Sequence, residues 1–237
     1  MQNSRRIVTI DIETLPAERD ENLALADDDE KPKAEDPNRK TALSGDFGRI
    51  LCIGYTDERA DGTRRMGVIG FDKQTKILHA DERQTLERFW NLMRGFNPQR
   101  DRVVGHNIFE FDLRFILKRS RIYGIRPTAE LSFRRYANQP VFDTMCEWEC
   151  WSRDKIKLEN LARALGLPTS KSEEICGARV FELYEAGRHE EIRDYCLRDV
   201  RLTREIYRRM TFCEPEDLTA CQEFAGMQVF QASRQVN

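Results

Sequence analysis

Asp11 and Glu13 lie at the end of the first apolar run of the chain, Ile7-Val8-Thr9-Ile10-Asp11-Ile12-Glu13-Thr14. The run is rich in β-branched residues and closes at Pro16, a pattern that predicts a buried strand. Because side chains alternate along a strand, both carboxylates would point to the same face of the sheet. Two carboxylates crowded beside a hydrophobic sheet repel each other and lose hydration, so they need a proton or a cation between them. The pair is therefore a candidate cradle for Mg²⁺ or Mn²⁺, although a strand that runs out into solvent would show the same pattern.

Asp112 is a second candidate ligand, in the stretch Gly105-His106-Asn107-Ile108-Phe109-Glu110-Phe111-Asp112-Leu113. It lies in the first turns of a helix predicted over about 109–119, directly after a short predicted strand at Val103-Val104. Sheets of α/β proteins place their ligands at the carboxyl ends of strands, and Asp112 would be aimed there. Taken alone, it is better explained as an aspartate that favours the dipole at a helix start.

Tyr195 and Asp199 form a third candidate, on a helix predicted from about Glu190 to Met210. Residues four apart share a helix face, so the phenol and the carboxylate would project together. Taken alone, the pair could be an exposed aspartate beside a half-buried tyrosine. The three features nevertheless follow one another at successive predicted sheet edges, and such a series is much harder to explain by chance than any one member.

The elements that must position these side chains alternate along the chain. After the first run, strands are expected at 49–55 and 65–71, joined by a turn at Asp61-Gly62, and shorter strands at 103–104 and 141–142. Helices are expected over about 81–95, 109–119, 157–165, 177–186 and 190–210. Three strands that could form a meander, followed by alternating helices and strands, predict a mixed α/β sheet covered by helices.

Length and composition predict one soluble globular domain over residues 1–237. Of the 237 residues, 40% are hydrophobic and 34% are charged, and the net charge of −2 argues neither for nor against a nucleic-acid partner. Two basic clusters, Lys118-Arg119-Ser120-Arg121 and Arg134-Arg135, could contact phosphates or could be ordinary solvated surface. Residues 17–46 contain acidic and proline-rich segments and predict a mobile loop, which could be a flap over the acidic pair or a tolerated insertion. Residues 211–237 are expected to be an extension.

The cysteine pattern and the absence of targeting signals predict a cytoplasmic protein without a membrane contact. No apolar stretch approaches the roughly 18 residues of a membrane span, and no signal peptide precedes the first strand. The seven cysteines contain no C-x-x-C pair, and none of the three histidines lies near Cys146 or Cys150. Reduced, mostly buried thiols are therefore expected, in place of a zinc site.

Taken together, these motifs resemble those of the DEDD 3′–5′ exonucleases, in particular the tyrosine-bearing (DEDDy) branch. Within that branch the chain looks like the proofreading exonuclease domain of family B DNA polymerases and like stand-alone proteins built in the same way. The resemblance covers roughly residues 6–210, and the matching residues are Asp11, Glu13, Asn107, Phe111-Asp112-Leu113, Tyr195 and Asp199. Segments Phe142-Asp143-Thr144 and Lys157-Leu158 through Gly166-Leu167 also look like parts of that family. The resemblance implies an α/β, ribonuclease H-like (DnaQ-like exonuclease) fold with a central mixed five-stranded sheet flanked by helices.

The resemblance also implies a metal-dependent reaction that releases nucleoside monophosphates from a 3′ end. In such sites two divalent ions, Mg²⁺ or Mn²⁺, lie about 3.5–4 Å apart. Asp11 would bridge the ions, Glu13 and Asp199 would help to hold the ion that carries the attacking water, and Asp112 would steady the other. Tyr195 would orient that water, because a phenol with a pKa near 10 is a poor base at neutral pH.

A single-stranded substrate is expected, because the terminal nucleotide must reach a site at the sheet edge, and the resemblance favours DNA. The resemblance makes Thr14, Asn107, Phe109 and Phe111 candidates for substrate contact, the aromatic rings by stacking on bases. Core packing is an alternative for Phe111, and a plain turn position is an alternative for Asn107. Asp143 is expected to cap the next helix.

Two other functions remain open. No residue decides between DNA and RNA, so an exoribonuclease of the same fold is an alternative. A nucleic-acid-binding module that has lost activity is another, and the presence of all four carboxylates argues against it. No polymerase segment is recognised, so any proofreading would act in trans; DNA repair and nucleotide scavenging are equally open, and no partner polymerase or repair protein is identified.

A rival third motif, His189-Glu190-Glu191-Ile192-Arg193-Asp194, satisfies the pattern of the histidine-bearing branch. Val200, Leu202 and Ile206 follow Asp199 with the spacing that the tyrosine branch shows, so Asp199 is preferred to Asp194. His189 is then expected to be a polar residue at a helix start.

Overall fold

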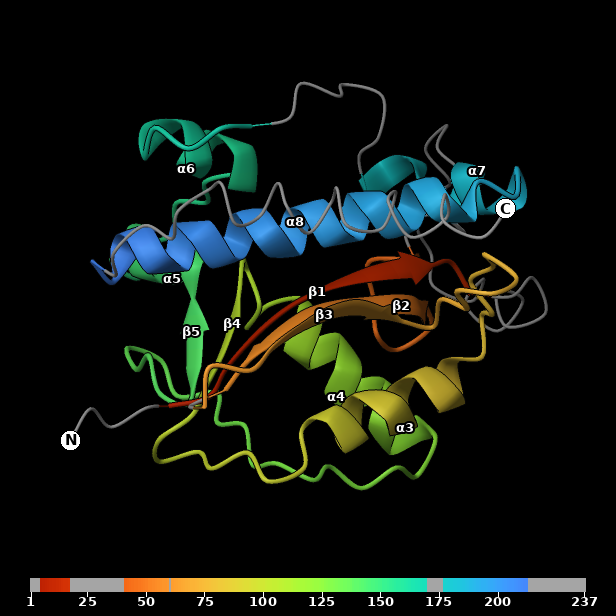
Figure 1. Ribbon diagram of the computed structural model, residues 1–237, viewed down its shortest axis with the longest axis horizontal. Helices are drawn as coiled ribbons and strands as arrows, with labels where there is room; N and C mark the ends of the chain where they lie inside the picture. The colour runs from red at the N-terminus through yellow and green to blue at the C-terminus, as the bar shows by residue number, and fades with distance from the viewer. Residues whose placement is uncertain (1–4, 18–40, 60, 170–176, 213–237) are drawn as a thin grey trace, which may run out of the picture.

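Five strands form one mixed sheet in the computed structural model, which describes residues 5–17, 41–59, 61–169 and 177–212 (Figure 1). The strands are β1 (Ile7–Leu15), β2 (Arg49–Glu58), β3 (Arg64–Ile69), β4 (Arg102–Gly105) and β5 (Val141–Asp143), in the order β3-β2-β1-β4-β5. Strand β2 is antiparallel to β1 and β3, whereas β4 is parallel to β1 and β5. The predicted α/β class with a mixed five-stranded sheet is therefore confirmed.

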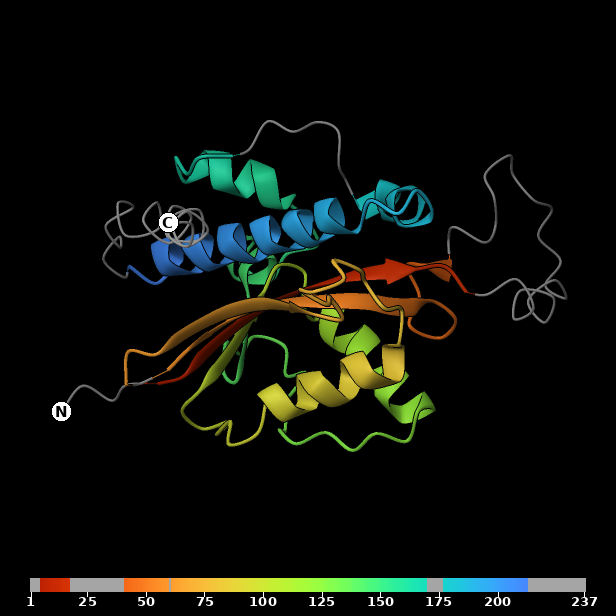
Figure 2. The ribbon, with the colours of Figure 1, turned by 45° about the vertical axis from the view of Figure 1, so that its right-hand side comes forward.

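Helices cover both faces of this sheet. They are α3 (Glu82–Leu92), α4 (Asp112–Ile122), α5 (Thr144–Trp148), α6 (Leu158–Ala164), α7 (Val180–Glu185) and α8 (His189–Met210), with a 3₁₀ turn at Gly177–Arg179. Helices α3 and α4 lie on one face and α8 runs along the other, as Figures 1 and 2 show from two directions. None of the helices in the described part of the chain combines the length and the apolar character that crossing a membrane requires.

Strand β1 is covered on both sides, and its alternation decides which side carries the acidic residues. Ile12 and its even-numbered neighbours belong to a core cluster that includes Phe89 of α3 and Leu113 of α4. Burying each such side chain contributes about 1.5–3 kcal/mol, which fixes the register of the strand. Asp11 and Glu13 consequently face the opposite side, which α8 covers.

Helix α8 approaches the sheet closely because β2 has no side chain at one position. A Cβ added at Gly54 would lie 2.6 Å from Sγ of Cys196 and 2.9 Å from Cγ2 of Val200. Gly54 is paired with Asp11 in the β1–β2 ladder. The missing side chain therefore lets α8 lie directly over the acidic end of β1.

Helix α4 begins at Asp112, three residues later than the start predicted at about 109. Asn107 has a φ of +59°, and Asp143 accepts the backbone N–H groups of Asn107 at 2.9 Å and of Phe109 at 3.2 Å. These contacts hold residues 107–111 in a turn, so the helix starts only after it. The result places Asp112 at the first helical position, beside the end of β1.

Parts of several predictions fall outside the described residues. Residues 18–40 of the predicted loop and residues 213–237 of the predicted extension are among them. Of the seven cysteines, four lie in the described part as free thiols; Cys52 and Cys196 are buried, Cys146 is half-buried and Cys150 is exposed.

Candidate active site at the end of strand β1

Asp11 and Glu13 project from β1 toward α8, as their spacing predicts. One ligand atom from each of these carboxylates and Sγ of Cys196 all lie within 4.8 Å of one another. Glu13 is buried, with 5% of its surface exposed. The β1–β2 register shifts between Glu13 and Thr14, and such bulges are frequent next to active sites, where they re-aim a side chain.

Asp112 joins the group from the start of α4. One of its carboxylate oxygens accepts the backbone N–H of Ile12 at 3.0 Å, and only 3% of the residue is exposed. Ile12 is the residue between Asp11 and Glu13, so this hydrogen bond ties α4 to the acidic end of β1. The turn at residues 107–111 gives Asp112 the position that makes the contact.

Asp199 and Tyr195 complete the group from α8. Asp199 is 9% exposed, and its interaction with the hydroxyl of Tyr195 lowers the pKa of Asp199 against the effect of burial. The guanidinium of Arg198 lies 5.2 Å from the centre of the Tyr195 ring, which restrains the ring from the other side. One helix face therefore delivers both side chains to the end of β1, as the spacing of four residues predicts.

Burial disfavours the ionised form of all four carboxylates, and repulsion from nearby carboxylates adds to it. Burial, and then the nearby Asp112 and Asp199, raise the pKa of Asp11 well above its ordinary value. Burial and the neighbouring Asp11 do the same for the pKa of Glu13. Burial raises the pKa of Asp112 to about 7 and that of Asp199 to about 6, against the hydrogen bonds that each accepts.

The donor set fits divalent metal ions. Among the described residues, none of the four carboxylates forms an ion pair with a lysine or arginine. Buried carboxylates without a cationic partner are costly, and a bound cation removes that cost. Oxygen-only ligands of this kind suit Mg²⁺ and Mn²⁺. The thiol of Cys196, which donates to the backbone oxygen of Asp11 at 3.8 Å, lies beside this set.

These pKa shifts predict that the metal-free protein loses stability as the pH rises. The folded pKa values of Asp112 and Asp199 lie above the unfolded value of about 4, so the folded state binds more protons in between. The stability that these two groups give to the folded state is fully present below a pH of about 4. It is lost as the pH rises past about 6 for Asp199 and past about 7 for Asp112. Thermal unfolding in EDTA should therefore show a Tm that falls from pH 5 to pH 8, and Mn²⁺ should raise the Tm most at pH 8.

The control for this prediction is Asp112→Asn. His106 is half-buried, and the desolvation of its ring lowers its pKa, so its own contribution to stability rises with pH and opposes the trend. The difference between wild type and Asp112→Asn isolates the carboxylate effect, because His106 is unchanged in both. A Tm difference between the two proteins that does not vary from pH 5 to pH 8 would contradict the assignment.

The four residues predicted to contact substrate differ in how far their side chains are already engaged within the protein. The side-chain carbonyl oxygen of Asn107 is buried and has no hydrogen-bond partner among the described residues, so it is available to a ligand. Phe109 is buried and lines a cavity, whereas Phe111 packs edge-on against Phe115 with ring centres 5.7 Å apart. The hydroxyl of Thr14 donates to the carbonyl of Ala42 at 2.7 Å and is thus engaged within the protein.

Asp194 of the rival register lies away from the cluster. Its side chain is 64% exposed and pairs with Arg193 at 2.7 Å. His189 is the first residue of α8, and its ring packs edge-on against Tyr184 at 5.2 Å. The geometry therefore favours Asp199, which is buried next to Tyr195.

Asp143 and Cys196 show what sequence patterns could and could not reveal. The predicted cap is confirmed, because the carboxylate of Asp143 accepts the N–H groups of Met145 at 3.0 Å and Cys146 at 3.3 Å. For Cys196 the sequence predicts only a reduced thiol, and no role at the site. Its position beside Asp11 follows from its being next to Tyr195, and that adjacency is the one signal that the sequence offered.

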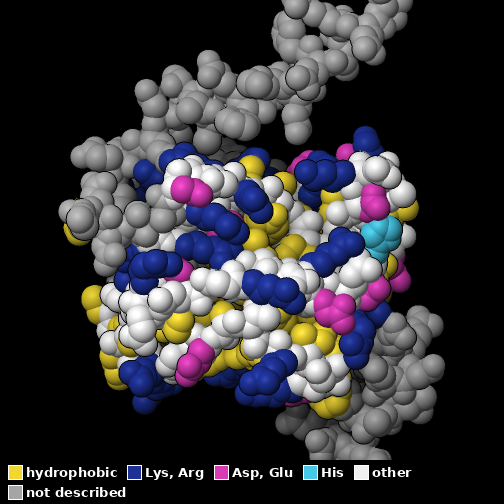
Figure 3. All heavy atoms as spheres, turned by 60° about the horizontal axis from the view of Figure 1, so that its bottom comes forward, with side chains coloured by type: hydrophobic (Ala, Val, Ile, Leu, Met, Phe, Trp, Pro, Cys, Tyr) yellow, Lys and Arg dark blue, Asp and Glu magenta, His cyan; other side chains and the backbone are white. Residues whose placement is uncertain are grey.

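The two basic clusters differ in their contacts. Arg119 is buried and pairs with Glu82 at 2.7 Å, and Lys118 pairs with Asp46 at 2.7 Å, so that cluster largely joins α4 to its neighbours. Arg134-Arg135 is exposed and lines a cavity beside α4. Figure 3 turns the lower side of Figure 1 toward the reader and shows lysine and arginine side chains spread across that face.

Comparison with known proteins relates this chain to one protein family and to solved structures of a similar fold. Residues 43–229 match a family described as predicted 3′–5′ exonuclease related to the exonuclease domain of PolB. No curated protein matches the chain. Among 89 matching chains of solved structures is the family B DNA polymerase of the hyperthermophilic archaeon Pyrobaculum calidifontis, with 20% identity and a TM-score of 0.53. That match covers 84% of this chain and 23% of the polymerase, so the likeness concerns the fold of one part of that enzyme.

Proposed function

Because this chain belongs to the family of predicted 3′–5′ exonucleases related to the exonuclease domain of PolB, we propose that it is an active, metal-dependent exonuclease. It would hydrolyse the terminal phosphodiester of single-stranded nucleic acid, with DNA favoured, and release nucleoside monophosphates. One observation carries the proposal: Asp11, Glu13, Asp112 and Asp199 come from three elements and converge at one strand end, where none of them forms an ion pair with a lysine or arginine of the described part of the chain. We also infer that residues 1–237 form a single exonuclease domain with a core at about 6–210.

Each carboxylate has a proposed role. Asp11 would be shared between two ions, as the resemblance implies, and the nearby Asp112 and Asp199, which both raise its pKa, support this role. Glu13 and Asp199 would hold one ion and Asp112 the other. Divalent ions bound there would neutralise the repelling carboxylates, lower the pKa of the attacking water and stabilise the charge that develops on the phosphate.

Tyr195 would orient the attacking water and would not remove its proton. Burial, and then the nearby Asp199, raise the pKa of its phenol far above the ordinary value of about 10, so the hydroxyl stays protonated at neutral pH. A protonated hydroxyl can donate and accept hydrogen bonds, and that capacity is all that positioning requires.

Tyr195→Phe is therefore expected to lower kcat by about 10²-fold and to leave KM and the affinity for Mn²⁺ nearly unchanged. Steady-state kinetics on a single-stranded oligonucleotide, with Mn²⁺ binding measured separately, would test this. Tyr184→Phe on α7 is the matched control, because it removes a half-buried phenol away from the carboxylates. A kcat for Tyr195→Phe equal to that of wild type would remove Tyr195 from the mechanism.

Digestion of 5′-labelled single-stranded DNA and RNA tests the function itself. With Mg²⁺ or Mn²⁺ the wild-type chain should produce a ladder shortened from the 3′ end, and EDTA should prevent it. Faster loss of RNA than of DNA would favour the exoribonuclease alternative. Wild-type protein that is inert on both polymers with either ion would overturn the enzyme proposal in favour of a binding module.

A further inference from the structure

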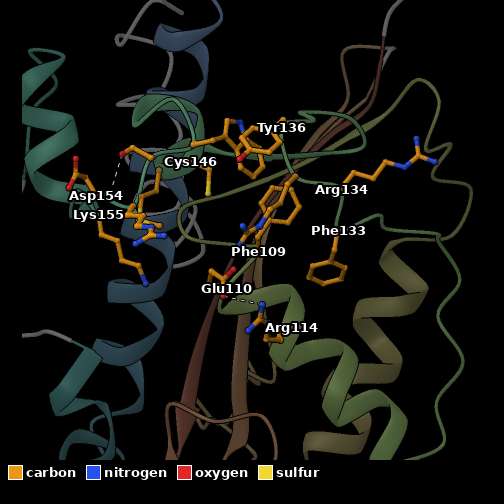
Figure 4. Close-up of a pocket in the computed structure, with 14 residues that line it drawn as sticks. Phe109, Glu110, Arg114, Phe133, Arg134, Tyr136, Cys146, Asp154 and Lys155 are labelled. Atoms are coloured by element: carbon orange, nitrogen blue, oxygen red, sulfur yellow. Dashed lines mark hydrogen bonds and ion pairs between the residues drawn. The ribbon is translucent and has the colours of Figure 1, made fainter.

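A cavity of about 710 Å³ lies beside the start of α4 (Figure 4). Phe109 and Glu110 form part of its wall and belong to the turn that leads into Asp112. The remaining walls come mainly from two loops, residues 133–136 before β5 and residues 151–155 after α5. Its volume is within the range of ligand-binding clefts, and none of the proposed metal ligands lines it.

Aromatic rings form a continuous series along this cavity. Ring centres are 6.1 Å apart for Phe133 and Phe109, 5.6 Å for Phe109 and Trp151, and 5.4 Å for Trp151 and Tyr136. Tyr136 is 74% exposed and Phe133 is 41% exposed, so both present ring surface to solvent. Exposed aromatic surface gathered in one hollow is typical of a binding site.

Two of these aromatic residues have an unfavourable backbone conformation. Tyr136 has a φ of +60° and Trp151 a φ of +61°, a region that bulky side chains rarely adopt. Trp151 is fixed there, because its N–H donates to the carbonyl of Cys146 at 2.8 Å and its indole N–H to Glu147 at 3.2 Å. Such conformations persist where the surrounding structure enforces them and are concentrated at ligand sites.

Basic side chains surround the rings. Five of the residues that line the cavity are basic and two are acidic, and one acidic residue, Glu110, already pairs with Arg114 at 3.0 Å. The other four basic residues form no ion pair within the described part of the chain; they are Arg134, Arg135, Arg153 and Lys155. In sites for single-stranded nucleic acid, unpaired basic side chains bind the phosphates and exposed aromatic rings stack on the bases.

We infer that this cavity binds the nucleotides that precede the 3′-terminal nucleotide of a single-stranded substrate. The inference rests on the proposed function, which places the 3′ end at the neighbouring carboxylates. Bases would stack on Phe133, Tyr136 and Trp151, and the phosphates would contact the unpaired basic side chains. A paired duplex offers no free base faces to such a series of rings, so the cavity would also favour single strands.

Binding of fluorescent oligothymidylates in EDTA tests this inference without hydrolysis. The lengths to compare are one nucleotide, which has nothing before its 3′ end, and about twelve nucleotides, because single-strand sites commonly span several nucleotides. The test variant is Arg135→Ala/Tyr136→Ala. The matched control is Arg209→Ala/Phe212→Ala at the end of α8, which also removes one exposed arginine and one exposed aromatic ring.

The test variant should bind the longer strand at least about fivefold more weakly, the loss expected from one base stack, and the shorter strand as wild type does. The salt dependence of binding should also weaken by about one phosphate contact. Unchanged affinity, an equal loss for both lengths, an equal loss in the control, or wild type that binds neither strand would overturn the inference. If the protein hydrolyses no strand but the test variant weakens binding of the longer strand only, the nuclease proposal alone is rejected. If the protein produces a ladder shortened from the 3′ end but the test variant binds as wild type does, this binding site alone is rejected.

Discussion

Replacing Asp11 by asparagine is expected to lower the rate of 3′-terminal hydrolysis by about 10³-fold or more. Asp11 interacts with carboxylates of both neighbouring helices, since Asp112 and Asp199 both raise its pKa. Asparagine keeps the shape of the side chain but cannot neutralise bound cations. Single-turnover digestion of a 5′-labelled strand with Mn²⁺ would measure the loss.

The same substitution is expected to stabilise the metal-free protein. It removes a buried charge that repels its neighbours, and relieving such strain at an active site commonly gives about 0.5–2 kcal/mol. Thermal unfolding in EDTA should thus show a higher Tm for Asp11→Asn, and Mn²⁺ should raise its Tm less than that of wild type. Asp194→Asn, at an exposed site of α8, is the control and should change neither quantity. A variant that is both less stable and fully active would contradict the proposed role of Asp11.

The second large effect separates Asp199 from Asp194. Asp199→Ala should lower activity by about 10³-fold, because it removes a buried carboxylate that we propose holds an ion and that interacts with the hydroxyl of Tyr195. Asp194→Ala should retain activity within about twofold, since its exposed pair with Arg193 contributes little. Both variants lie on α8, so circular dichroism and Tm would show whether each remains folded.

The opposite ranking would transfer the site to the rival register. An indispensable Asp194 with a dispensable Asp199 would mean that His189, not Tyr195, accompanies the metal ligands. It would also require α8 to turn a different face to the sheet than the one that buries Ile192, Cys196 and Val200.

Local rules predicted the acidic cluster because each of its members depends on a short-range pattern. Strand alternation places Asp11 and Glu13 on one face, and helical spacing places Tyr195 and Asp199 on one face. The covering helices also follow from periodicity, and their ends differ from the predictions by only a few residues. To predict that the three elements converge on one site, the order of the motifs along the chain was also needed.

The start of α4 and the aromatic cavity could not be predicted from the sequence, because both depend on how residues far apart in the chain are arranged. The start of α4 depends on Asp143, which lies far along the chain and accepts the N–H groups of Asn107 and Phe109. The aromatic cavity depends on Tyr136 and Trp151, which adopt left-handed conformations in loops without periodicity. Neither propensity nor spacing predicts where such loops place a ring, because the surrounding structure enforces the backbone there.

The family match begins at residue 43 and therefore leaves out Asp11 and Glu13. These two residues come to the site through β1, the central strand of the sheet, and through the hydrogen bond between Ile12 and Asp112. Their membership of the site is thus a structural inference, which makes them the most informative residues to examine directly.

A crystal structure with Mn²⁺ and a short phosphorothioate-ended oligonucleotide tests the central claim, that the four carboxylates hold the ions of hydrolysis. The account predicts two anomalous peaks about 3.5–4 Å apart, with Asp11 between them and the 3′-terminal phosphate adjacent. Glu13 and Asp199 should contact one ion, and Asp112 should lie on the side of the other. An oligonucleotide bound with no Mn²⁺ at Asp11, or Mn²⁺ bound away from these carboxylates, would contradict it.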